Sequence, residues 1–123
     1  MAQVTVRYFV EDVAAAVAFY CDRLGFRVDL PRAPGFAGLA RGDLRLLLHE
    51  PGAGGAGIAG GTPAPGGWNR FQIAVADIGS TVEKLKSEGV QFRGEIVEGP
   101  AGHQILAEDP SGNPVEIFQP RTA

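Results

Sequence analysis

The chain repeats one pattern of elements twice within its 123 residues. The segments VRYFVED at 6–12 and RFQIAVAD at 70–77 both place an apolar residue at every second position, and both close on an aspartate. A stretch of helical composition follows each aspartate and ends at a glycine, Gly25 or Gly89. Such alternation predicts a strand, and an aspartate, an apolar stripe and a glycine in that order predict a capped helix. The repeat therefore predicts two copies of one βαβββ unit in an α+β fold.

Each predicted copy has the same order of elements: a strand, a helix and three further strands. In the first copy we expect strands over 4–10, 26–30, 36–40 and 44–50, a helix over 13–24, and turns at 31–35 and 41–43. In the second copy we expect strands over 70–77, 91–99, 103–109 and 114–119, a helix over 78–88, and a turn at 109–113. Asp12 and Asp77 are the expected helix caps.

One segment separates the two copies and holds most of the excess glycine. The chain has 18 glycines and 9 prolines, and eight of the glycines and three of the prolines lie in PGAGGAGIAGGTPAPGG at 51–67, which carries no charge. We therefore expect a single domain over 1–123, with module one at 1–51, a connector at 52–67 and module two at 68–123. The connector leads to Trp68, and we hypothesise that it also acts as a lid over the site.

Composition and charge narrow the class of protein. Hydrophobic residues make up 45% of the chain, its net charge is −3, and it has one cysteine. No basic stripe indicates nucleic-acid binding, no apolar run reaches the length of a membrane span, and no signal-peptide pattern opens the chain. We expect a cytoplasmic protein that binds neither nucleic acid nor membranes.

Three segments resemble the vicinal oxygen chelate superfamily, which includes glyoxalase I, extradiol dioxygenases and bleomycin resistance proteins. They are VEDVAAAVAFYCDRLGFRV at 10–28, VADIGSTVEKLKSEGVQF at 75–92 and EDPSGNPVEIFQP at 108–120. The resemblance implies two tandem βαβββ modules that form a curved eight-stranded cup with two outer helices. It also implies a homodimer, because homodimers are common in this family.

Strand alternation assigns side chains to the face of the cup, because successive residues of a strand point to opposite sides. The candidate ligand-binding residues are those expected on this face, with Trp68 at its mouth. They are Thr5, Arg7, Phe9, Arg45, Leu47, His49, Trp68, Arg70, Gln72, Glu116 and Phe118.

The resemblance also implies where a metal would bind. Metal-dependent members of the superfamily carry His or Glu at four positions of the cup, and here these positions fall on Thr5, Leu47, Arg70 and Glu116. Only Glu116 is a good ligand for a divalent cation, and the guanidinium of Arg70 would repel one. We expect no metal and no other cofactor, although a shifted site that uses His49 and Glu116 stays open.

Two functions are compatible with these residues. Arg70 and Glu116 are expected on neighbouring strands as an ion pair, which either only neutralises two charges or anchors a ligand. The first hypothesis is a metal-independent binding protein for an aromatic or natural-product-like small molecule, similar to the bleomycin and antibiotic resistance proteins. The alternative is a glyoxalase-like lyase or isomerase acting next to a carbonyl, with Glu116 as base and Arg70 or His49 as electrophile or acid. A fold without small-molecule function is the third possibility.

Overall fold

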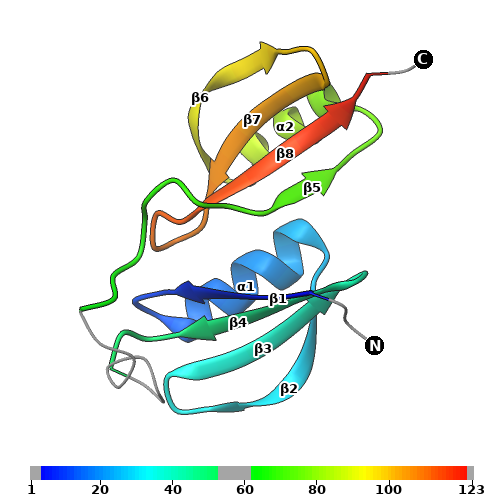
Figure 1. Ribbon diagram of the computed structural model, residues 1–123. Helices are drawn as coiled ribbons and strands as arrows, with labels where there is room; N and C mark the ends of the chain where they lie inside the picture. The colour runs from blue at the N-terminus through cyan, green and yellow to red at the C-terminus, as the bar shows by residue number, and fades with distance from the viewer. Residues whose placement is uncertain (1–3, 53–61, 122–123) are drawn as a thin grey trace. The chain divides into compact units, whose positions relative to one another are not determined.

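The computed structural model describes residues 4–52 and 62–121, which divide into two compact units. The first unit comprises β1 (Val4–Phe9), α1 (Val13–Leu24), β2 (Arg27–Ala33), β3 (Phe36–Arg41) and β4 (Leu44–His49). The second unit comprises β5 (Gln72–Ala74), α2 (Ile78–Ser87), β6 (Gln91–Glu98), β7 (Gly102–Glu108) and β8 (Pro114–Pro120) (Figure 1). The predicted α+β fold with two βαβββ modules is confirmed.

The two sheets have the same topology. Each is a mixed four-stranded sheet, in the order β1-β4-β3-β2 in the first unit and β5-β8-β7-β6 in the second. The first strand of each unit runs parallel to the last, and the other pairs are antiparallel. In the parallel pairs, Arg7 lies opposite Leu47, and Gln72 lies opposite Glu116. These two pairs therefore occupy equivalent places in the two units.

Helix α1 begins and ends where the sequence predicts. The side chain of Asp12 accepts a hydrogen bond from the backbone N–H of Ala15 at 3.1 Å, which satisfies one of the free donors of the first turn. Gly25 takes the left-handed conformation at φ 75°, which closes the helix without the strain of a side chain. The buried stripe of α1 includes Phe19 and the fully buried Tyr20, so this helix contributes aromatic rings to the core.

Helix α2 uses the same devices with smaller side chains. Asp77 accepts a hydrogen bond from the backbone N–H of Ser80 at 3.1 Å, and Gly89 follows the helix at φ 88°. The helix ends at Ser87, one residue before the predicted end. Its buried residues are all aliphatic: Ile78, Val82 and Leu85.

The structure differs from the predicted boundaries around the second strand. β2 continues through Pro31 to Ala33, and the turn is confined to Pro34 and Gly35, whereas the sequence predicts a turn over 31–35. A proline fits here because β2 is an edge strand, and its pairing with β3 is irregular on both sides of Leu30.

The turn between β7 and β8 has the predicted geometry. The carboxylate of Asp109 accepts hydrogen bonds from the backbone N–H and the side-chain amide of Asn113, both at 2.9 Å, and Gly112 has φ 85°. Residues 53–61 of the glycine-rich connector lie outside the described residues, and so does most of the predicted lid. Within 4–52 and 62–121, no helix is both long enough and apolar enough to cross a membrane.

Candidate functional site

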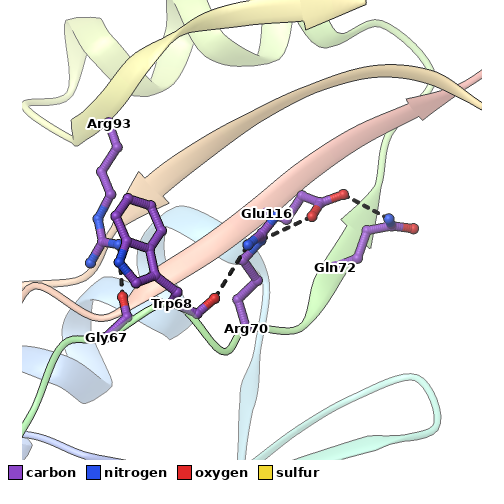
Figure 2. Close-up of polar contacts among 6 residues, drawn as sticks. All are labelled: Gly67, Trp68, Arg70, Gln72, Arg93 and Glu116. Atoms are coloured by element: carbon purple, nitrogen blue, oxygen red, sulfur yellow. Dashed lines mark hydrogen bonds and ion pairs between the residues drawn. The ribbon is translucent and has the colours of Figure 1, made fainter. Parts of the chain in front are cut away.

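Glu116 lies at the centre of a polar cluster on the sheet of the second unit. Its neighbours in β8, Val115 and Ile117, are buried on the side of α2, so the carboxylate projects from the opposite face. One oxygen accepts a hydrogen bond from Nε of Arg70 at 3.0 Å, and the other accepts one from Nε2 of Gln72 at 2.8 Å (Figure 2). The predicted ion pair between Arg70 and Glu116 is confirmed, and both carboxylate oxygens of Glu116 are engaged.

Arg70 reaches this carboxylate from outside the strand. The sequence predicts a strand from residue 70, but β5 begins at Gln72 and contains only three residues. Arg70 therefore lies in the segment that leads into β5, where its Nη1 also donates a hydrogen bond to the backbone carbonyl of Trp68 at 3.2 Å. This bond links the ion pair to the position of the tryptophan.

Trp68 presents an exposed ring supported on one face by an arginine. The guanidinium of Arg93 lies over the indole with its central carbon 4.8 Å from the ring centroid, while 69% of the residue is exposed (Figure 2). Arg93 is itself held by hydrogen bonds to the carboxylate of Glu108 at 2.7 Å and to the backbone carbonyl of Gly67 at 2.8 Å. Trp68 is thus an exposed residue whose indole has one face covered by a guanidinium.

Arg93 and Glu108 are the site residues that sequence reasoning missed. Arg93 precedes a left-handed glycine, Gly94 at φ 77°, and the pairing of β6 with β7 shifts between Arg93 and Val97. Alternation along β6 therefore cannot be followed from end to end. The one available signal was that Arg93 and Glu108 carry opposite charges on consecutive strands.

A hollow of about 240 Å³ lies beside the cluster. Arg70 and Arg93 both contribute to its lining, together with Gln104, Leu106 and Val97. The pairing register places Arg93 opposite Leu106, so the hollow lies on β6 and β7, and Arg70 joins its lining from the segment before β5. The second unit thus places two guanidinium groups beside a cavity with apolar side chains in its wall.

The remaining predicted residues divide between the two sheets. Phe118 lies opposite Ala74 and is half-buried in the second unit. In the first unit, β1 and β4 bring six predicted residues together as three cross-strand pairs on one sheet. These pairs are Thr5 with Arg45, Arg7 with Leu47, and Phe9 with His49.

The first-unit set has its own polar and aromatic contacts. Nε of Arg45 donates a hydrogen bond to the carboxylate of Asp29 at 2.7 Å. His49 is 6% exposed and lies between two aromatic rings, with ring centroids 4.8 Å from that of Phe36 and 6.4 Å from that of Phe9. Asp29 and Phe36 were not among the predicted residues.

The four positions that the family resemblance assigns to a metal carry unsuitable donors here. Of Thr5, Leu47, Arg70 and Glu116, only Glu116 offers a carboxylate, and the guanidinium of Arg70 already lies 3.0 Å from it. Within 4–52 and 62–121, no three His, Cys, Asp or Glu side chains group together as metal ligands. These four residues do not fit a divalent cation, and a shifted site at His49 and Glu116 stays a prediction.

Comparison with protein families identifies the class of the chain. Residues 2–117 match the model of the Glyoxalase/Bleomycin resistance protein/Dioxygenase superfamily. The match covers most of the chain, which therefore belongs to this superfamily, as the sequence predicts.

Solved structures of three named proteins are similar to this chain. Lactoylglutathione lyase from Agrobacterium tumefaciens is 21% identical with a TM-score of 0.74, over 96% of this chain and 92% of that one. TnmS3, an antibiotic binding protein from Streptomyces sp. CB03234, is 26% identical with a TM-score of 0.72, over 98% and 96%. The bleomycin-binding protein from bleomycin-producing Streptomyces verticillus, complexed with copper(II)-bleomycin, is 27% identical with a TM-score of 0.64, over 98% and 97%. No curated protein matches the chain.

Proposed function

We propose that this chain is a binding protein for planar aromatic, natural-product-like small molecules and that it acts without a metal ion. The observation that carries the proposal is the indole of Trp68, which is 69% exposed while Arg93 supports one face. A planar ligand can stack on the exposed face of this indole, and stacked aromatic rings gain stability beyond the area that they bury. The exposed face of Trp68 is therefore suited to stacking.

The hollow lined by Arg70 and Arg93 sets the size of the ligand. Its volume of about 240 Å³ is below the roughly 300–1,000 Å³ of drug-sized sites. It suits a small planar molecule or one ring system of a larger one. Leu106 and Val97 supply apolar surface, while Arg70 and Gln104 supply polar groups that can fix the orientation of a ligand.

Two of the similar structures support a binding role. TnmS3 is an antibiotic binding protein, and the Streptomyces verticillus protein binds bleomycin. Their identities of 26% and 27% exceed the 21% of the lactoylglutathione lyase. The arginines beside Trp68 disfavour a cationic ligand for this chain, so the shared feature that we propose is a planar ligand.

The donor set supports independence from a metal. Both oxygens of Glu116 already accept hydrogen bonds, and one of the donors is a permanent cation. A divalent ion at Glu116 would have to displace Arg70 from this carboxylate.

The alternative is a lyase or isomerase that uses Glu116 as its base. It is favoured by one observation, because Arg70 and Gln72 hold the carboxylate of Glu116 in a fixed orientation. Arg70 would then polarise a substrate carbonyl. We prefer the binding function because both oxygens of that carboxylate are occupied.

Calorimetric titration with the neutral probe naphthalen-2-ylmethanol tests the proposed function. We expect Trp68→Ala to weaken binding by about tenfold or more, because the stacking face is lost. Trp68→Phe keeps an aromatic face and should stay within about threefold of the native protein. Equal affinities for the native protein and Trp68→Ala would contradict the proposed site.

Two further measurements separate the alternatives. Stoichiometric metal in protein purified without chelators would contradict independence from a metal. Loss of turnover of an aromatic carbonyl substrate in Glu116→Gln, with binding retained, would favour the enzyme. A cytoplasmic homodimer completes the proposal, and sedimentation analysis of the purified protein tests the dimer.

A further inference from the structure

We propose that Arg93 sets a charge preference in this site, so that a planar ring bearing an acidic oxygen binds more tightly than the same ring bearing an ammonium group. The inference rests on the proposed function, because it concerns ligands stacked on Trp68. It adds the ligand's charge class and assigns Arg93 as the residue that selects it.

Arg93 changes the electrostatic potential at the indole of Trp68. The face of an aromatic ring is negative and attracts cations. The guanidinium of Arg93 already lies over one face of Trp68, 4.8 Å from the centroid. Its positive charge offsets the negative potential of the ring, so the opposite face attracts a cationic ligand less than a lone tryptophan would.

Arg70 has a hydrogen-bond donor that a ligand can use. Arg70 donates through Nε to Glu116 and through Nη1 to Trp68, and its Nη2 donates no hydrogen bond to the part of the chain that the structure describes. Arg70 also lines the hollow, so this donor is available to an oxygen of a ligand.

The acidic groups of the same region already have partners. Both oxygens of Glu116 accept hydrogen bonds, and Glu108 accepts one from Arg93 at 2.7 Å. Glu95, which also lines the hollow, has a side chain that is 85% exposed and lies 3.9 Å from the ammonium of Lys86. A ligand therefore meets an available guanidinium donor and two carboxylates that are already engaged, while the exposed Glu95 is only loosely paired.

Two hydrogen bonds hold the side chain of Arg93 in place. Its side chain is held at two atoms, by Glu108 through Nε and by the carbonyl of Gly67 through Nη1. Arginine presents donors in a planar fork, whereas lysine is a flexible point charge. Arg93 is thus a positioning residue that fixes the indole and its local potential together.

The test compares three probes that share one ring system: 2-naphthoate, naphthalen-2-ylmethanol and naphthalen-2-ylmethylammonium. Calorimetry gives the dissociation constant of each probe without interference from the ultraviolet absorption of the naphthalene ring. We expect the native protein to bind naphthoate about tenfold more tightly than the ammonium probe, with the alcohol between them.

Four variants assign the preference to Arg93. Arg93→Gln should lower the ratio of the two charged probes by about threefold, because the donor of Arg70 remains, and Arg93→Lys should retain more of the preference. Glu108→Gln removes a negative charge beside Arg93 and should raise the ratio, which general unfolding would not do. Arg121→Gln is the control. It also removes one positive charge, but Arg121 follows β8 and lines a different hollow, so the ratio should stay unchanged.

The outcomes separate the two claims. Equal affinities of the three probes for the native protein would overturn the charge preference and leave the proposed function standing. A ratio unchanged by Arg93→Gln in folded protein would overturn the role of Arg93. No binding of any probe at millimolar concentration would contradict the proposed function and the preference with it.

Discussion

The two units share a backbone plan and differ in what they display on it. In the first unit, the parallel pair β1 and β4 places Arg7 opposite Leu47. In the second unit, the parallel pair β5 and β8 places Gln72 opposite Glu116. The same register therefore carries an apolar side chain in one unit and a buried carboxylate in the other. Repeating a fold fixes where side chains stand, and the residue at each place then decides the chemistry.

The cores of the two units differ in a similar way. Tyr20 makes edge-to-face contacts with Phe19 and Phe26, at centroid distances of 5.0 and 5.4 Å. The core under α2 is aliphatic, with Leu85 among its buried residues. The helix of the first unit thus buries larger side chains than the helix of the second.

Truncation of these core residues gives the largest expected effect. Tyr20→Ala should lower the free energy of unfolding by about 4 kcal/mol, because it empties the space of a fully buried ring. Leu85→Ala should cost about 3 kcal/mol, since a smaller side chain is lost. Urea denaturation of both variants measures the difference. A larger loss in Leu85→Ala would contradict the comparison between the two cores.

The helices were predictable because their signals are local. Asp12 and Gly25 bound α1 through contacts within a few residues, so the sequence alone indicates both ends. The partnership of Arg70 with Glu116 was also accessible, since alternation and the repeat put both on the same face of neighbouring strands. These predictions needed only the period of a strand and the order of the elements.

The support of Trp68 was not predictable in this way. Arg93 reaches Gly67 across 26 positions of the chain, and its place follows from a shift in the pairing of β6 with β7. Neither an irregular pairing nor the path of the segment before β5 leaves a periodic signal. The extent of β2 through Pro31 escaped for the same reason, because only the sheet order shows that it is an edge.

The turns before the last strand of each unit also differ, and their variants should give the next-largest difference in stability. In the second unit, Asp109 is 4% exposed and accepts two hydrogen bonds from the buried Asn113. Asp109→Ala should cost about 2–3 kcal/mol of stability, because it leaves buried donors unpaired. The equivalent turn of the first unit holds the exposed Asp43, and Asp43→Ala should change stability by no more than about 0.5 kcal/mol. Similar losses in thermal denaturation would contradict this difference.

Glu116→Leu tests the polar cluster, because leucine is the residue at the equivalent position of the first unit. We expect a loss of about 1–2 kcal/mol, because Arg70 and Gln72 lose an acceptor but can be hydrated. The side chain of Arg70 is 29% exposed, which limits the cost of leaving it unpaired. Glu116→Gln keeps a hydrogen-bonding group and should cost less, as measured by urea denaturation. A loss above that of Tyr20→Ala would show that the cluster, rather than the aromatic core, dominates stability.

The smallest expected effect concerns one equivalent position in the two helices. Cys21 in α1 and Lys86 in α2 stand at the same distance from their capping aspartates, and Cys21 is half-buried. Burial, and to a lesser degree the charge of Asp22, raise the pKa of the Cys21 thiol above its ordinary value. A raised pKa lowers the thiolate fraction at pH 8, so iodoacetamide should modify Cys21 several-fold more slowly in the folded protein than in urea. Asp22→Asn should speed the folded-state reaction slightly, and mass spectrometry over a range of pH measures both rates. Equal rates in folded and unfolded chains would show that the packing of α1 does not protect the thiol.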